Sequence, residues 1–188
     1  MSQLQDYFET MEFENYFIRL VHQSDLHDYF NLIDRNRKRL ETFFAGTVAL
    51  TKNIEATKIH LDDIISKQTI GNFYSFVVIE KNSGNIIGSI QIKSLDWNIP
   101  KGEIGYYIDE AYEGKGITTK AVAKIIEYGF QNLKLAKLFL RANSENKGSV
   151  KVAEKNGFEV EGKLRKDYKT TSGVLVDLTY YGLLNPEL

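Results

Sequence analysis

Residues 101–130 read "KGEIGYYIDEAYEGKGITTKAVAKIIEYGF", and this stretch decides the fold. Its β-rich part, 101–112, is predicted as a strand, and a glycine-flanked turn then leads into a helical apolar pattern. That pattern consists of Ala121, Val122, Ile125, Ile126 and Gly129. A further apolar run at 136–142 predicts a second strand. A strand, a helix and a strand in this order make the two strands parallel, or nearly parallel, neighbours.

Toward the N-terminus, two β-rich segments at 73–80 and 86–95 are joined by "KNSGN", which predicts a hairpin. With 101–112 they form an antiparallel meander. Before them we expect a strand at 16–21 and a helix capped by Ser24. We also expect a second helix over about 54–68, and between the helices an irregular stretch that contains an adjacent pair of phenylalanines.

Toward the C-terminus, residues 144–157 predict a helix that ends at Asn-Gly. The segments 158–168 and 174–184 predict a last hairpin. Together, these predicted elements form an α/β (α+β) fold with a mixed, mostly antiparallel sheet of about seven strands and helices on both faces. We expect a single domain over 16–184, preceded by an N-terminal extension at 1–15.

The composition of the chain argues against several classes of function. The chain has 188 residues, of which 43% are hydrophobic, enough for the core of one domain. A formal net charge of -1 disfavours a nucleic-acid surface, and zero cysteines exclude thiolate chemistry and disulfides. The three histidines lack metal-ligand spacing, so no metal is expected. With no apolar run near ~18 residues and no signal-peptide pattern, we expect a cytoplasmic protein without membrane contact.

The turn at 113–119 suits an anion. Gly114 and Gly116 allow a tight turn before a helix, whose first amides lack intrahelical partners and carry partial positive charge. Lys115 adds a charge, and Thr118 and Thr119 add hydroxyls. A phosphate would fit there, although an ordinary tight turn between strand and helix explains the glycines as well. The glycine and lysine spacing matches neither a P-loop nor a dinucleotide fingerprint.

"EGKGITTKA" after "GEIGYYIDEAY", followed by "RANSENKGSVKVAEKNGFEVEGKLR", resembles the GNAT acetyltransferase superfamily, and within it the RimJ/RimL type that acetylates ribosomal-protein N-termini. The resemblance runs over about 16–184 and is sharpest over 103–162. It implies a GNAT-like sheet. The family's phosphate loop reads Q/R-x-x-G-x-G/A, so Glu113 and Thr118 depart from it at its two ends.

The resemblance implies acetyl-CoA as cosubstrate. Its pyrophosphate would lie on the backbone amides of Gly114, Lys115, Gly116, Ile117, Thr118 and Thr119. The pantetheine arm would lie between 103–110 and 136–142, which splay apart, and would pair with the backbone near Tyr107, Ile108 and Asp109 as an added strand does. Asn143 and Asn146 are candidates to hold its polar groups, and helix capping is their alternative role.

The implied chemistry is direct attack of an amine on the thioester. Many members use a helical tyrosine as general acid, but the matching position here is Ala153. The RimL-like branch places a serine one turn earlier, which makes Ser149 the candidate donor of a proton to the thiolate. Glu103 and Glu161 are both candidates for the base, and a reaction without a dedicated base stays open, because an α-amino group has a pKa of only about 8.

The predicted acceptor is a primary amine, first of all a protein or peptide N-terminus such as that of a ribosomal protein. The cleft for it should lie between the N-terminal helices and the loop near 168–174, with Phe43, Phe44 and Trp97 as candidate walls. Two alternatives stay open: a small-molecule acetyltransferase acting on a polyamine, aminoglycoside or amino acid, and a non-catalytic acetyl-CoA-binding module. The chain is expected to be a monomer or a homodimer.

Overall fold

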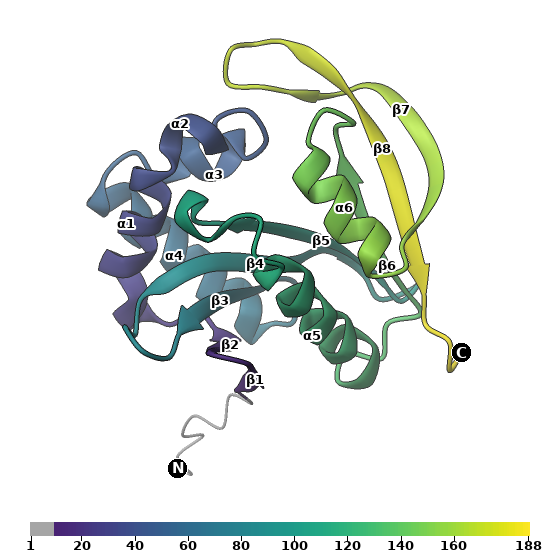
Figure 1. The fold of residues 1–188 in the computed structure, drawn as a ribbon, viewed down its shortest axis with the longest axis horizontal. Coiled ribbons are helices and arrows are strands. Elements are labelled where there is room, and N and C mark those ends of the chain that lie inside the picture. The colour runs from purple at the N-terminus through teal and green to yellow at the C-terminus, as the bar shows by residue number, and fades with distance from the viewer. Residues whose placement is uncertain (1–9) are drawn as a thin grey trace.

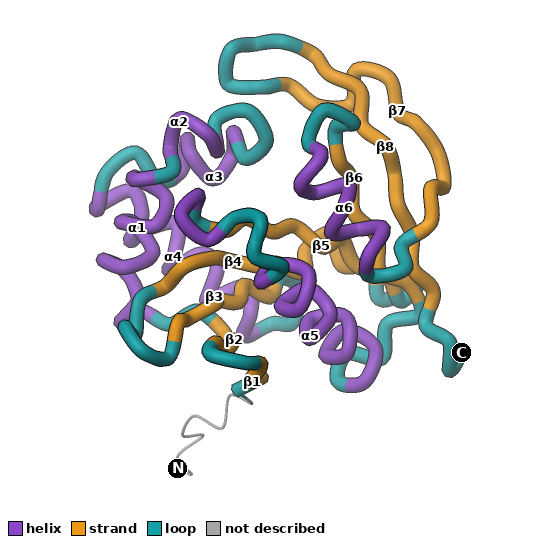
Figure 2. The backbone as a smooth tube through the Cα atoms, viewed as in Figure 1, coloured by secondary structure: helices purple, strands orange, loops and turns teal. Residues whose placement is uncertain are grey.

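A computed structural model describes residues 10–188 of the chain, in which eight strands form one sheet in the order β1-β2-β3-β4-β5-β6-β8-β7 (Figures 1 and 2). Neighbouring strands are antiparallel except β5 and β6, which are parallel as the sequence predicts. The strands are β1 Met11–Phe13, β2 Tyr16–Leu20, β3 Tyr74–Glu80, β4 Ile86–Asp96, β5 Lys101–Ile108, β6 Lys137–Ala142, β7 Glu159–Lys169 and β8 Leu175–Leu184. The α-helices are α1 Leu26–Arg35, α2 Arg37–Leu40, α3 Ala45–Leu50, α4 Ile54–Thr69, α5 Ile117–Gln131 and α6 Lys147–Lys155, and two 3-10 turns are η1 Gln23–Asp25 and η2 Glu110–Tyr112.

The fold class is confirmed, and the sheet gains one strand over the predicted seven. The extra strand, β1, pairs with β2 at the sheet edge, so part of the predicted extension 1–15 belongs to the sheet. The first nine residues of that extension lie outside the described residues. Ser24 is not a helix cap, because it lies within η1, and α1 starts only at Leu26.

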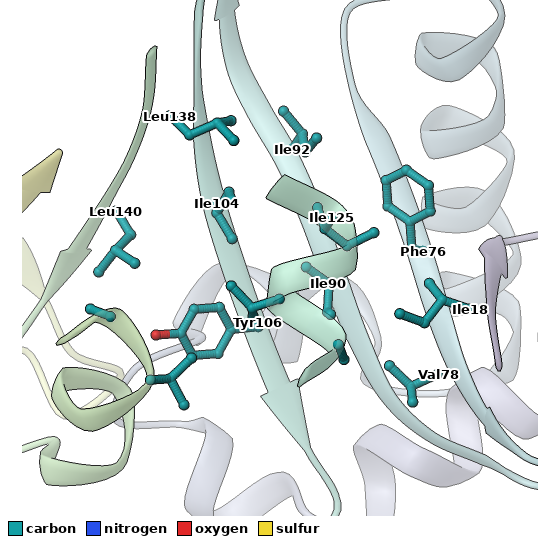
Figure 3. Close-up of a cluster of buried hydrophobic side chains, with 14 of the residues drawn as sticks. Ile18, Phe76, Val78, Ile90, Ile92, Ile104, Tyr106, Ile125, Leu138 and Leu140 are labelled. Carbon is teal, nitrogen blue, oxygen red and sulfur yellow. The ribbon is translucent and has the colours of Figure 1, made fainter. Parts of the chain in front are cut away.

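One face of the sheet packs under α5 and α6. Isoleucines and leucines that alternate along β4, β5 and β6 meet the apolar side of α5, with Ile125 at the centre (Figure 3). α5 starts where the sequence predicts, after Gly116, and its length fixes the crossover from β5 to β6.

The other face packs under the N-terminal helices. Buried Tyr29, Leu32 and Ile33 of α1 pack on β4, and Leu61 and Ile64 of α4 pack on β3, in a cluster that also includes Tyr107 of β5. The stretch expected to be irregular, 40–53, holds the short helix α3, and α2 ends at its first residue. Phe44, which lies between these two helices, packs against Tyr107 of β5 with 5.0 Å between the ring centres.

The pairing of β5 with β6 ends early, and this positions the site. Register contacts run only from Lys101–Lys137 to Glu103–Phe139, although β5 continues to Ile108. β6 instead follows β8 up to the Ala142–Thr179 pair. The predicted splay is therefore present, and within residues 10–188 no strand pairs with the outer edge of β5 beyond Glu103.

The β7–β8 hairpin arches from this gap toward α2 and α3 (Figure 1). At its tip, the Thr171 hydroxyl donates to the Glu41 carbonyl at 2.8 Å. Next to it, the Ala45 amide donates to the Tyr168 hydroxyl at 2.9 Å. Segments far apart in the sequence thus close one side of the splayed region.

Candidate active site

The gap between β5 and β6 holds a cavity of about 600 Å³ on the side of α5 and α6, which we call the loop-side cavity. The loop of Gly114 and Gly116, the first turn of α5 and the inner side of α6 line it. A second cavity of about 280 Å³, the far-face cavity, lies on the side of the sheet that carries Gln91, Lys93 and Glu103. Both cavities share the lining residues Phe43, Phe44, Tyr106, Asn146 and Ser149, so they meet at the splayed strands.

The loop has the geometry of an anion site. Gly114 and Gly116 have φ of 72° and 77°, the left-handed region that favours glycine. Gly116 is the N-cap of α5, and the first intrahelical bond is from Lys120 N–H to its carbonyl, at 3.2 Å. The amides of Ile117, Thr118 and Thr119 precede that bond, so they have no partner within the helix and form the partially positive end of its dipole. All three residues line the loop-side cavity.

Lys115 is placed differently from the prediction. Its Nζ donates to the Ala111 carbonyl at 2.8 Å and lies 5.1 Å from the centre of the Tyr112 ring. The residue does not line the loop-side cavity, because these two contacts fold the side chain back along the loop. Its cation therefore does not face the space beside the glycines.

The free edge of β5 also corrects the prediction for Tyr107 and Asp109. The Asp109 amide donates to the Ile87 carbonyl at 2.7 Å, and Ile108 is paired with Gly88, so Ile108 occupies a non-hydrogen-bonded position toward β4. Tyr107 then exchanges both its backbone bonds with Ser89. By alternation, the backbone groups of Tyr106 and Ile108 face the gap, and an added strand would pair with these two residues.

Asp109 has a structural role. Its carboxylate caps η2 by accepting from the Ala111 amide at 3.1 Å and pairs with Arg35. Burial by itself raises the pKa of Asp109, but the hydrogen bond from Arg35 and the amide bond outweigh it and hold the pKa below its ordinary value.

Four cationic residues that line the loop-side cavity were not predicted from the sequence as site residues. Arg39 of α2 lies beside the loop, and its guanidinium donates to the carboxylate of Glu113. Lys147, Lys151 and Lys155 lie one helical turn apart on α6 and line the opposite wall. The lysine spacing was visible in the sequence as a charged helix face, whereas the position of Arg39 depends on how α2 packs.

Ser149 lies where the two cavities meet, as its predicted role requires. Its amide donates to the side chain of Asn146 at 3.1 Å, so Asn146 is the N-cap of α6. Its carbonyl accepts from the Tyr106 hydroxyl at 2.9 Å. Both bonds use backbone atoms of Ser149 and leave its hydroxyl for other partners. Burial raises the pKa of Tyr106, so its phenol stays protonated.

Glu103 lines the far-face cavity and is 5% exposed. Arg141 donates to both its oxygens, at 3.2 and 2.9 Å, and the Ser94 hydroxyl donates at 3.2 Å. Lys93 lies 3.7 Å from the carboxylate, and Arg141 also pairs with Asp167 at 3.1 Å. One carboxylate therefore faces this cavity between two cations.

Glu161 is not brought to either cavity. It is the extra residue of a β-bulge between Val160 and Gly162, and its carboxylate lies over Gly182 and pairs with Lys137. Lys137 begins β6, at the end where β5 and β6 are still paired. Glu161 therefore lies outside the linings of both cavities and is paired with Lys137.

The structure also shows where Asn143 and the three aromatic candidates for the cleft wall lie. Asn143 lines the far-face cavity, but its amide group already donates to the Asp177 carbonyl at 3.1 Å and accepts from the Glu145 amide at 2.8 Å. It therefore braces the end of β6 against β8. Phe43 and Phe44, candidate walls of the acceptor cleft, line both cavities, whereas Trp97 lies in the β4–β5 turn and lines neither.

Comparison with known proteins identifies this architecture. Residues 16–159 match the model of an acetyltransferase (GNAT) domain, and the chain therefore belongs to the GNAT acetyltransferase family. It is 34% identical over 178 residues to the "Putative ribosomal N-acetyltransferase YdaF" of Bacillus subtilis, with 93% of each chain covered. It is 29% identical to the spermidine N(1)-acetyltransferase of Escherichia coli over 58% of this chain and 59% of that one. The crystal structure of the ribosomal-protein-S5-alanine acetyltransferase of Vibrio fischeri superposes with a TM-score of 0.86, at 28% identity over 95% of this chain and 97% of that one.

The chain is thus an N-acetyltransferase of GNAT fold with RimJ/RimL-like neighbours. Within residues 10–188, no helix is both long and apolar enough to cross a membrane. The same residues contain no cluster of three histidine, aspartate or glutamate side chains able to hold a metal ion.

Proposed function

We propose that the protein transfers the acetyl group of acetyl-CoA to the N-terminal α-amino group of a protein or peptide. The observation that carries the proposal is the junction of the two cavities at the splayed strands, with an anion-binding helix terminus on one side and an acceptor space on the other. The coenzyme enters along the loop-side cavity, and the amine reaches the thioester from the far-face cavity.

The loop-side cavity suits the coenzyme in shape and charge. The amides of Ile117, Thr118 and Thr119 receive the pyrophosphate, and the edge of β5 at Tyr106 and Ile108 pairs with the pantetheine amides. The lysine row of α6 adds positive charge along the opposite wall. The thioester then lies near Ser149, where the cavities meet.

We assign three roles in the reaction. Ser149 donates the proton to the departing thiolate, or orients the sulfur, through a hydroxyl that its helix does not use. A backbone amide on the open edge of β5 stabilises the oxyanion. Glu103 is the carboxylate on the acceptor side, and because Arg141 donates to both its oxygens, its role is to hold the amine rather than to take its proton. The geometry does not support this role for Glu161.

The charge of the far-face cavity favours a peptide over a polyamine. Its charged lining residues are Lys93, Arg141 and Glu103, and the one carboxylate is already paired with the arginine. A polycation would bring several positive charges to a lining that offers little compensating charge. The YdaF-like and S5-alanine-acetyltransferase-like neighbours, named for ribosomal acceptors, agree with this choice, and such an acceptor would place the reaction in the cytoplasm.

The spermidine acetyltransferase among the relatives keeps a small-molecule acceptor as the second candidate. A single panel separates the two. The protein is incubated with acetyl-CoA and with peptides that begin with Ser, Ala, Thr or Met, or with spermidine or an aminoglycoside, and the mass gain of one acetyl group is measured. Peptide acetylation at the α-amine supports the proposal, and modification of spermidine alone overturns it. Binding of acetyl-CoA without any turnover would favour the non-catalytic module.

A further inference from the structure

We propose that Arg39 is a coenzyme-binding residue that exchanges partners. In the structure its Nη1 pairs with Glu113 and its Nη2 contacts the free edge of β5; on binding, Nη1 stays on Glu113 while Nη2 leaves the strand edge and, together with Nε, binds the phosphates of acetyl-CoA. The inference rests on the proposed function, because it takes acetyl-CoA as the ligand. It names the residue that replaces the positive charge missing from the phosphate loop.

The first step is the charge of the loop. Glu113 stands where related phosphate loops have Gln or Arg, and it lines the loop-side cavity beside Gly114 and Gly116. A carboxylate there repels a pyrophosphate unless a cation neutralises it. Lys115 does not, because its Nζ is held by the Ala111 carbonyl. Arg39 does, since its Nη1 pairs directly with Glu113.

The second step is the backbone that Arg39 covers. Its Nη2 donates to the Ile108 carbonyl, one of the groups on the free edge of β5. A pantetheine amide that adds to this edge needs acceptors of this kind, so the guanidinium occupies space that the arm requires. Binding of the coenzyme along β5 therefore displaces the guanidinium toward the cavity, where the phosphates lie.

The third step is the incomplete bonding of Arg39. Its Nη2 also donates to Asn36 at 3.1 Å, but its Nε is buried without a hydrogen-bond partner among the described residues. A buried donor without a partner is costly, whereas a phosphate accepts two parallel bonds from a guanidinium fork. The exchange therefore gives Arg39 better partners. Asn36 keeps its own bond from the Glu110 amide, at 3.0 Å, so the loop stays attached to α1.

The test compares two acetyl donors, acetyl-CoA and acetyl-pantetheine, which lacks the phosphates, by calorimetry and steady-state kinetics. For Arg39→Ala we expect acetyl-CoA to bind about tenfold to a hundredfold more weakly, the range of one charge-assisted hydrogen bond. Acetyl-pantetheine should bind equally well or more tightly, because the Ile108 carbonyl is freed. Glu113→Gln should tighten acetyl-CoA alone and should recover part of the loss in the double variant.

Lys38→Ala is the matched control, because it removes an exposed cation from the same helix outside the cavity, and it should leave both donors unaffected. Equal weakening of both donors by Arg39→Ala would show a merely structural role and overturn the inference. An unchanged affinity for acetyl-CoA, in a variant whose melting temperature matches wild type, would overturn it too. Failure of the wild-type protein to bind acetyl-CoA would instead overturn the proposed function from which the inference starts.

Discussion

Replacing Ser149 by alanine tests one proposed contribution to catalysis, the interaction of its hydroxyl with the departing thiolate. The amide and carbonyl of Ser149 carry its structural bonds, to Asn146 and from Tyr106, so Ser149→Ala leaves both in place. Alanine also has a higher helix propensity than serine, by roughly 0.5 kcal/mol. We therefore expect a melting temperature equal to or slightly above that of the wild type, and an unchanged dissociation constant for acetyl-CoA.

The catalytic loss should be large by comparison. General acid catalysis contributes about 10²–10⁴-fold, and a thiolate leaving group, whose conjugate acid has a pKa near 8.5, needs the lower part of that range. We expect kcat to fall about 100-fold, equivalent to about 2.7 kcal/mol in the activation barrier.

The assay is continuous detection of released thiol with a Ser-initiated peptide, alongside calorimetry with acetyl-CoA. Ser149→Thr is the matched control, because it retains a hydroxyl at the same position, and it should keep most of the rate. A kcat for Ser149→Ala within about threefold of wild type would refute the role of the hydroxyl, because a proton donor contributes at least tens-fold.

Three further predictions concern the acceptor side, the loop and the pH limit. Glu103→Gln should lower kcat/KM for the peptide more than tenfold without changing the affinity for acetyl-CoA. Glu161→Gln should change neither kcat/KM nor this affinity. Equal effects of the two substitutions would contradict the assignment of Glu103, and not Glu161, to the acceptor side. Gly116→Ala should destabilise the fold by about 1 kcal/mol, measured by urea unfolding, because φ is 77° while the added Cβ would meet no atom of a residue distant in the chain within 4 Å. A loss above about 3 kcal/mol would contradict this, because it would require a clash as well as the strained φ. Burial by itself raises the pKa of Asp25, but hydrogen bonds from Arg19 at 2.7 Å outweigh this effect and hold the pKa below its ordinary value. The ionised carboxylate therefore stabilises the folded protein above about pH 4, and this contribution is lost as the pH falls through the lowered pKa. Asp25→Asn should flatten that part of a stability curve measured by thermal unfolding against pH, and an unchanged curve would contradict the assignment.

Much of the fold follows from local signals in the sequence. Gly116 and the apolar spacing after it place α5 within a residue of its observed start, and the crossover rule gives the parallel pairing of β5 with β6. The three-residue strand β1 and the short helices α2 and α3 are too short to leave a periodic pattern. Their formation depends on packing against elements elsewhere in the chain.

The site was less predictable for two physical reasons. The position of Glu161 depends on a single inserted residue, and a shift of one residue in a strand reverses the face to which a side chain points. Arg39 meets Glu113 across a separation of 74 residues, so no local pattern joins them. By contrast, the lysines at 147, 151 and 155 have helical spacing, and plotting them on the predicted helix would have revealed their common face.

The meeting of two cavities through one gap in the sheet has a kinetic consequence. In the proposed arrangement the donor and the acceptor approach from opposite faces, so neither has to leave before the other arrives, and both are bound when the acetyl group is transferred. No acetylated side chain is needed as a carrier between them. Double-reciprocal plots at several fixed concentrations of the second substrate should therefore give intersecting rather than parallel lines.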